Sequence, residues 1–219
     1  MAFQKRNFSV ITNFGCKNSC YYCAFANHRL RNTHQEIDFD YLSWCYGKYK
    51  ASKVSISGGG DPLYNIGENY NILSQIIKSS PYSVDLHTNE NLLDKLSFLK
   101  SLAPNQIVVT TNEISEIRIL ELERLLEFTK VRAVLIYLNQ SLEFIQKWSQ
   151  IYSFVPRLTI RECWGMKTNF NDIKILLQPK FPKIRFLEDG DYNYYFMPDN
   201  TVYDDYQATK ISKIFRRDV

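Results

Sequence analysis

The chain alternates short β-rich segments with helical patterns, and this alternation limits the possible folds more than any other feature of the sequence. Because consecutive strand–helix units build a parallel sheet with right-handed crossovers, the pattern predicts an α/β fold. Eight such units close a TIM barrel in about 250 residues, so six units predict a partial (β/α)6 TIM-type barrel. The expected strands are Phe8–Thr12, Lys53–Ser57, Ser83–His87, Ile107–Thr111, Ala133–Leu138 and Arg157–Arg161.

The helical segments carry their own start and stop signals. We expect Asp38 to cap the helix after the first strand and Gly47 to end it, because acidic caps and terminal glycines are common at these positions. Cys45 falls on the apolar face of this helix, so we expect it in the core. Ser141 is the expected start of a later helix.

From Lys183 onward the pattern changes to short β-rich segments separated by turn residues, which predicts a small antiparallel β meander. We expect residues 1–180 to form the barrel and residues 181–219 to form the meander and a tail within the same domain. The expected strands here are Lys183–Glu188, Tyr192–Met197 and Thr201–Tyr203.

The bulk composition is that of a globular protein, with 45% hydrophobic and 23% charged residues. A net charge of +4 is too small to favour nucleic acid as a partner. No apolar run approaches the ~18 residues that a membrane helix needs, and the N-terminus lacks the apolar region of a signal peptide. We therefore expect a cytoplasmic protein without a membrane partner. In that reducing compartment, clustered cysteines indicate a metal or catalytic site.

Three of the five cysteines, Cys16, Cys20 and Cys23, lie in the loop after the first strand with the spacing C-x3-C-x2-C. Three thiolates can hold three irons of a [4Fe–4S] cluster and leave the fourth iron open. The alternative is a zinc site, for which His28 or His34 is the local candidate for a fourth ligand.

Three of the eight glycines, Gly58, Gly59 and Gly60, follow the second expected strand and precede Asp61 and Pro62. Glycines at a strand end allow positive φ angles and close approach of the backbone to a ligand. A phosphate-binding loop would require a Gly-Lys-Ser/Thr ending, which is missing here. A plain turn is the other interpretation.

The segment Cys16-x3-Cys20-Tyr21-Tyr22-Cys23 resembles the signature of the radical S-adenosylmethionine (SAM) superfamily. Gly59-Gly60-Asp61-Pro62, one strand–helix unit later, resembles the Gly-Gly-Glu-Pro motif of the same family. The resemblance implies a [4Fe–4S] cluster on the three cysteines, with SAM bound at the open iron. It further implies reductive cleavage of SAM to a 5′-deoxyadenosyl radical, which abstracts hydrogen from a substrate.

The resemblance also assigns cofactor contacts position by position. Tyr22 would lie against the adenine, and Gly58, Gly59, Gly60 and Asp61 would surround the methionine amino group. Aspartate is one methylene shorter than the family's glutamate, so backbone contact is the firmer expectation.

Strand ends supply the remaining candidates, because polar groups at the carboxyl edge of barrel strands usually face the active site. Thr88 and Asn89 follow the third strand, with a helix N-cap as the alternative for Asn89. The fourth strand ends at Thr110, Thr111 and Asn112, which the resemblance places near the SAM ribose, with ordinary capping as the alternative. Arg161 is a candidate partner of the SAM carboxylate. The catalytic candidates at the end of the sixth strand are Glu162 and Cys163.

Glu162 and Cys163 are expected to meet substrate, and a thiol near the radical can donate or lose a hydrogen atom. The alternative for Cys163 is an inert buried thiol. The implied reductant is a flavodoxin or a ferredoxin.

The expected function is that of a radical SAM enzyme of the oxidoreductase or lyase type, acting on a small-molecule or nucleotide-like substrate. Alternatives are an activase that generates a glycyl radical or modifies a peptide, and a zinc-binding regulatory module.

Overall fold

The computed structural model describes residues 7–11, 15–18, 20–23, 37–58, 60–163, 166–188, 193–197 and 200–203. Within these residues the strands form one nine-stranded sheet of order β7-β6-β5-β4-β3-β2-β1-β8-β9. The strands are β1 (Asn7–Val10), β2 (Val54–Ile56), β3 (Val84–Thr88), β4 (Gln106–Thr110), β5 (Lys130–Tyr137), β6 (Arg157–Glu162), β7 (Ile184–Leu187), β8 (Asn193–Phe196) and β9 (Val202–Tyr203).

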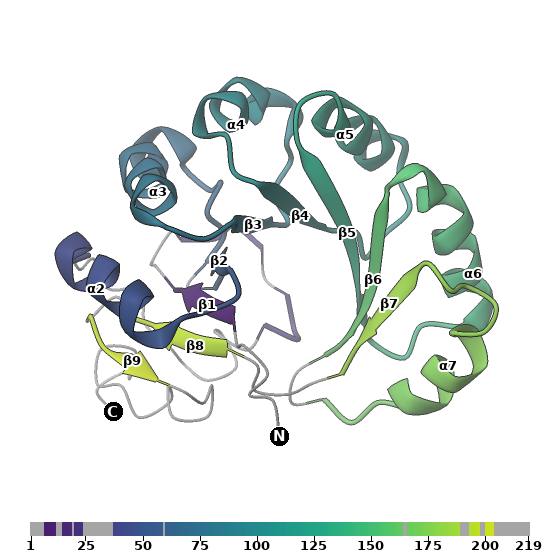
Figure 1. Ribbon diagram of the computed structural model, residues 1–219. Coiled ribbons are helices and arrows are strands. Elements are labelled where there is room, and N and C mark those ends of the chain that lie inside the picture. The colour runs from purple at the N-terminus through teal and green to yellow at the C-terminus, as the bar shows by residue number, and fades with distance from the viewer. Residues whose placement is uncertain are drawn as a thin grey trace.

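The described helices pack on the outer, convex face of this curved sheet, and none of them covers the inner, concave face (Figure 1). One helical segment follows each of β1 to β6, which confirms the six predicted strand–helix units. The helical segments are α2 (Phe39–Tyr49), α3 (Ile66–Ser79), the 3-10 turn η1 (Leu93–Lys95) with α4 (Leu96–Leu102), α5 (Glu116–Leu126), α6 (Leu142–Ile151) with the 3-10 turn η2 (Tyr152–Phe154), and α7 (Phe170–Leu177).

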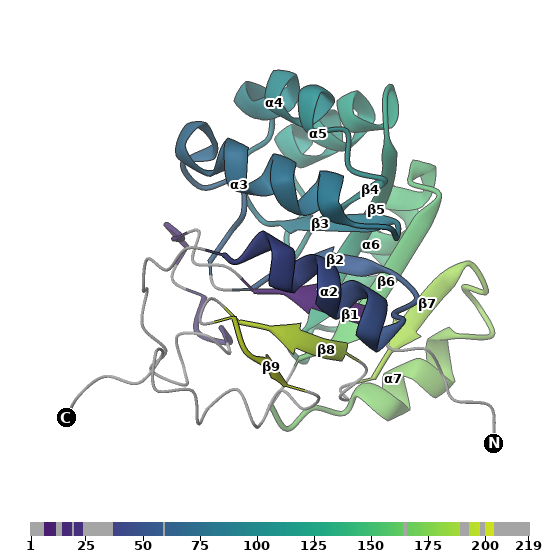
Figure 2. The ribbon, with the colours of Figure 1, turned by 60° about the vertical axis from the view of Figure 1, so that its left-hand side comes forward.

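The sheet stays open, as predicted. Strands β1 to β7 run parallel in chain order, and in the described part of the chain the edge strands β7 and β9 do not pair with each other. Strand β8 returns to the other side of β1 and pairs with it in parallel, and β9 adds an antiparallel partner to β8 (Figure 2). The result is a partial α/β barrel that ends in a short antiparallel pair.

The segment Lys183–Glu188 differs from the expectation of an antiparallel meander. Its strand β7 pairs in parallel with β6, because α7 crosses between them as the earlier helices do. The turn residues Asp189 and Gly190 lie outside the described residues.

Helix α2 begins as predicted, because the Asp38 side chain accepts a hydrogen bond from the Tyr41 backbone N–H at 2.9 Å. The predicted end at Gly47 is wrong. The helix continues to Tyr49, since the rings of Tyr46 and Tyr49 both contact Phe8 of β1 and hold the last turn against the sheet.

Alternation along the strands divides the sheet into two chemically different faces. Residues that point toward the helices form the apolar core, as Phe8 and Val54 do. Their neighbours on the concave face are mostly polar, although Val108 and Val134 also lie there. The buried polar ones are Ser9, Ser55, Asp85, Gln106 and Thr159. Because successive side chains point to opposite faces, this polarity belongs to the barrel interior. Among the described residues, no helix is both long enough and apolar enough to cross a membrane.

Candidate functional site

The cysteine loop and the glycine loop are joined backbone to backbone. Gly15, directly before the first cysteine, forms a parallel bridge with Gly60, and the Asp61 N–H donates to the Gly15 carbonyl at 2.7 Å. Gly60 has φ +106°, and a Cβ there would lie 2.0 Å from the Gly15 oxygen. Only glycine fits this close approach. The two predicted motifs therefore meet in the folded chain.

Gly58 also has a positive φ, of +88°, but a Cβ there would make ordinary contacts with Ile11 at 3.5 Å. Gly59, the central residue of the predicted motif, lies outside the described residues. His28 and His34, the candidate zinc ligands, also lie outside them.

The carboxylate of Asp61 joins the glycine loop to the end of β3. It is buried, and it accepts hydrogen bonds from the Leu63 N–H at 3.0 Å, the Thr88 hydroxyl at 2.8 Å and the Asn89 N–H at 2.6 Å. Burial raises the pKa of Asp61, although these hydrogen bonds act in the opposite direction. Asp61, Thr88 and Asn89, all predicted cofactor contacts, are thus joined to one another by hydrogen bonds.

Replacing Asp61 with asparagine is expected to destabilise the protein by about 2 kcal/mol, because the new amide NH2 faces donors that lose their acceptor. The measurement is the free energy of unfolding in urea. Glu123→Gln, the same chemical change at an exposed position of α5, is the matched control and should shift stability by no more than about 0.5 kcal/mol. Equal stability of the two variants would show that the Asp61 hydrogen bonds contribute little.

Glu90 ties the cysteine loop to the same strand end. Its side chain is 1% exposed and forms ion pairs with Lys17 at 2.9 Å and Lys95 at 3.0 Å. Lys17 lies between the first two cysteines, so this pair fixes the loop from the β3 side. Burial acts to raise the pKa of Glu90, but the two lysines outweigh it and lower the pKa. The sequence around Glu90 does not reveal this role, because nothing local to it indicates a partner 73 positions earlier.

The Glu90 contribution to stability is expected to depend on pH. Since its folded pKa lies below the ordinary value of 4.5, the stabilisation is complete above pH 4.5 and is lost as the pH falls through the folded pKa. The stability difference between wild type and Glu90→Gln should therefore be constant near neutral pH and shrink in acid. Urea titrations over a series of pH values measure it, and a difference that stays constant or grows in acid would contradict the assignment.

Tyr22 extends from the cysteine loop to the ends of β4 and β6. The Asn112 side-chain NH2 donates to the Tyr22 hydroxyl at 2.8 Å, and the Asn112 side-chain oxygen Oδ1 accepts from the Ile136 N–H at 2.9 Å. Burial raises the pKa of Tyr22, with smaller contributions from Cys20 and Cys163. The predicted residues Tyr22, Cys20 and Cys163 therefore lie near one another, although Cys163 itself is buried.

Thr111 requires a correction. It is fully buried, its hydroxyl donates to the Val134 carbonyl at 3.3 Å, and the Trp148 indole N–H donates to the Thr111 carbonyl at 2.9 Å. The expected ribose contact does not fit this burial. The next residue, Asn112, is the one at this strand end that reaches the cysteine loop, because adjacent residues of an extended chain point to opposite sides.

The remaining predicted residues occupy the cysteine loop and the end of β6. The Cys16 side chain is exposed and those of Cys20 and Cys23 are half-buried, with the Cys23 N–H donating to the Cys20 carbonyl at 3.0 Å. Arg161 is exposed on the concave face, and Glu162 is half-buried and accepts from the Thr168 hydroxyl at 3.3 Å. In the described part of the chain, no group of three or more His, Cys, Asp or Glu side chains is arranged around a single-ion position.

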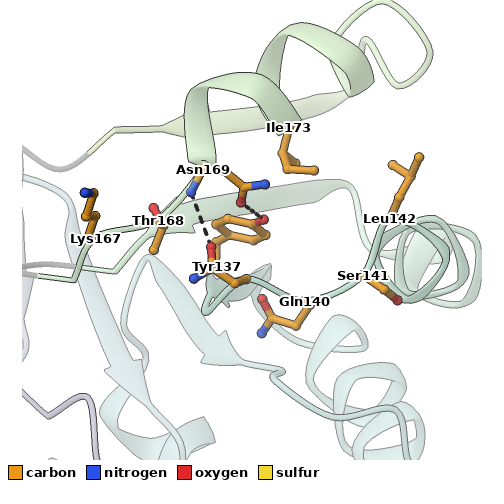
Figure 3. A pocket seen from close by; sticks show the side chains of 9 residues that line it. Tyr137, Gln140, Ser141, Leu142, Lys167, Thr168, Asn169 and Ile173 are labelled. Atoms are coloured by element: carbon orange, nitrogen blue, oxygen red, sulfur yellow. Dashed lines mark hydrogen bonds between the residues drawn. The ribbon is translucent and has the colours of Figure 1, made fainter.

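A separate pocket of about 660 Å³ lies where α6 and α7 begin (Figure 3). The Tyr137 hydroxyl donates to the Asn169 side chain, and the Asn169 N–H donates to the Asn139 side chain at 3.3 Å. None of the predicted motif residues lines this pocket. The motif residues instead meet at the carboxyl ends of β1 to β4, so that edge of the sheet is the candidate site.

Comparisons with known proteins show which solved structures share this fold. No protein-family model matches the sequence, and no curated protein matches it significantly. SuiB from Streptococcus suis matches 97% of this chain with a TM-score of 0.72 and 12% identity, over 63% of its own length. Coproporphyrinogen III oxidase (HemN) from Escherichia coli, which is a radical SAM enzyme, matches 81% of this chain with a TM-score of 0.52 and 15% identity, over 52% of its own length.

The fold is also shared outside that class. N-acetylneuraminate lyase from Mycoplasma synoviae matches 85% of this chain with a TM-score of 0.53 and 13% identity, over 63% of its own length. The chain thus spans less than two thirds of each of these proteins. At such identities the likeness shows the fold alone, and the same fold serves more than one chemistry.

Proposed function

We propose that this chain is a radical SAM enzyme that binds a [4Fe–4S] cluster through Cys16, Cys20 and Cys23 and cleaves SAM reductively. One observation carries the proposal: the cysteine loop is joined directly to the glycine loop by the Gly15–Gly60 bridge. A fold that includes radical SAM enzymes among its solved members supports it. The fold alone would not, since lyases share it.

The residues present fit such a cluster chemically. Three thiols lie in one eight-residue loop, and thiolates are the ligands of Fe–S clusters. When bound, the cluster and SAM would supply one-electron chemistry that the side chains of the protein lack. The glycine loop that begins at Gly58 would supply backbone contacts to the amino acid part of SAM. The positive φ angles of Gly58 and Gly60 set the course of this loop beside the cysteine loop.

The protein's own residues would position the cluster and SAM relative to each other. Asp61 and Glu90 fix the glycine and cysteine loops to the end of β3, and Asn112 orients the Tyr22 ring. Arg161 is exposed and would bind the SAM carboxylate.

Further parts of the proposal concern the substrate and the electron source. Glu162 and Cys163 would face the substrate, a small molecule. A flavodoxin or ferredoxin would deliver the electron, in the cytoplasm. Solved structures with this fold favour neither the glycyl-radical activase nor the zinc-binding module, and we propose neither.

Anaerobic reconstitution with iron and sulfide tests the proposal. The wild-type protein should take up iron and sulfide and show the broad visible absorbance of an Fe–S cluster, whereas Cys20→Ala should retain little of either. Cys45→Ala is the matched control, because it also removes one cysteine but lies in the core of α2. It should assemble the cluster as the wild type does. A wild-type protein that takes up no iron, or a Cys20→Ala variant that assembles a normal cluster, would contradict the proposal.

A further inference from the structure

The concave face of the sheet carries an unusual concentration of positive charge. Arg132 of β5 lies beside Arg157 of β6 in the strand register, and Arg185 of β7 lies beside Thr159. Since side chains two residues apart share a face, Arg157, Thr159 and Arg161 all point to this side, and so do their partners in register. Lys53, directly before β2, joins the group through its ion pair with Asp85.

One carboxylate, that of Asp85, lies within this basic group. It accepts from Lys53, from the Arg132 guanidinium at 3.1 Å and from the Gln106 amide at 3.3 Å. Arg157 is bonded to the neutral Gln106 at 2.7 Å, so its charge is not neutralised there. With Lys130, which lies in register with Gln106 at the start of β5, six cations share this face with the single carboxylate of Asp85 among the described residues.

Two of the guanidinium groups have no hydrogen-bonding or ion-pair partner among the described residues. Arg161 and Arg185 are exposed, and within the described part of the chain neither forms a hydrogen bond or an ion pair. Both add their positive charge to the surroundings of Arg132. Guanidinium groups with no carboxylate partner are suited to bidentate binding of an oxyanion.

Two buried polar atoms close to these arginines also lack partners among the described residues. They are the Nε2 atom of His87 and the Nε atom of Arg132. Burial and the charges of Arg132, Arg161 and Lys53 lower the pKa of His87, so its imidazole is neutral. Buried polar atoms are nearly always hydrogen-bonded. Two buried nitrogen atoms without a partner, close to two arginines without a partner, therefore indicate a binding site for a polar ligand.

We propose that this concave face binds an oxyanion of the substrate, a phosphate or a carboxylate, with Arg185 as the principal contact and Arg132 and Arg157 beside it. Arg161 lies two residues nearer the carboxyl edge than Arg185, about 7 Å along the strands. This offset leaves Arg161 for the SAM carboxylate and Arg185 for the substrate. The inference rests on the proposed function only in identifying the anion as part of the substrate.

Calorimetric titration of the reconstituted full-length protein at low ionic strength tests the proposal, with inorganic phosphate and succinate as the probes. Wild type should bind at least one of them, and Arg185→Gln should weaken that binding about tenfold or more. Arg185→Lys, which keeps the charge without the bidentate fork, should fall between them. Arg124→Gln, which removes an exposed arginine of α5, is the matched control and should bind as the wild type does.

The two arms identify the anion, because tighter binding of phosphate indicates a phosphorylated substrate and tighter binding of succinate a carboxylate. The proposal is overturned if wild type binds neither probe, or if Arg185→Gln binds as tightly as Arg124→Gln. Arg185 is exposed and unpaired in the described structure, so its replacement should leave the fold intact, and the thermal midpoint checks this. Anion binding is measured separately from SAM cleavage, so failure of the radical SAM assignment is distinguishable from failure of this site.

Discussion

Replacing Gly60 with alanine is expected to separate the cysteine loop from the glycine loop and to abolish both cluster assembly and SAM binding. The new Cβ would lie 2.0, 2.6 and 2.8 Å from the O, C and N atoms of Gly15, and these are backbone atoms that no rotamer change can move. The φ angle of +106° adds strain for any residue with a Cβ. We expect a loss of about 3 kcal/mol or more in the free energy of unfolding.

Two further glycine variants make this experiment quantitative. Gly47→Ala lies in α2 with nothing within 4 Å of the new Cβ, so it should keep the cluster and raise stability by about 0.5–1 kcal/mol. Gly58→Ala meets only ordinary contacts and should cost about 1–2 kcal/mol, from its positive φ. A Gly60→Ala variant as stable as Gly58→Ala, with normal cluster content, would mean that the Gly15–Gly60 junction does not organise the site.

Much of the fold could be predicted because it follows from local patterns. Alternating strand and helix segments gave the six units and their parallel order, and Asp38 capped α2 as expected. The end of α2 could not be predicted from Gly47, because long-range packing of Tyr46 and Tyr49 on Phe8 outweighs a glycine near a helix end. Strand β7 was assigned to the wrong arrangement because a short strand does not reveal its partner, and its pairing with β6 is set by α7.

The parts of the site that depend on local sequence could also be predicted, and those that depend on long-range contacts could not. The cysteine and glycine motifs are local, and the structure brings them together. The roles of Asp61 and Glu90 depend on residues 28 positions later and 73 positions earlier, which spacing cannot reveal. At the end of β4 the candidates were Thr110, Thr111 and Asn112, of which Thr111 is buried and Asn112 reaches Tyr22. Spacing alone could not choose among them, because adjacent residues of an extended chain point to opposite sides.

The basic concave face was visible in the sequence but was not recognised. Asp85 and His87, Arg157 and Arg161, and the single Arg185 stand at alternate positions of buried strands, where an ordinary core would have apolar residues. Such alternation of charge within a parallel strand indicates a polar barrel interior. It identifies the strands that face a ligand, although the partner of each charge emerges only from the strand register.

Loss of the second cysteine is the other change with a very large expected effect. Cys20 lies in the middle of the C-x3-C-x2-C motif, and the Tyr22 side chain interacts with it. Without its thiol, the loop offers two cysteines, too few to hold the cluster at three irons. Cys45→Ala removes a fully buried thiol from α2 and costs about 1–2 kcal/mol of stability, while it leaves the loop unchanged.

The most direct test of the account is the formation of 5′-deoxyadenosine from SAM by the reconstituted protein under reduction with dithionite in the absence of oxygen. We predict that wild type and Cys45→Ala form 5′-deoxyadenosine and methionine, and that Cys20→Ala forms neither above the background of a reaction without protein. A wild-type protein that holds a complete [4Fe–4S] cluster yet forms no 5′-deoxyadenosine, or a Cys20→Ala variant that forms as much as wild type, would contradict the assignment of this chain as a radical SAM enzyme.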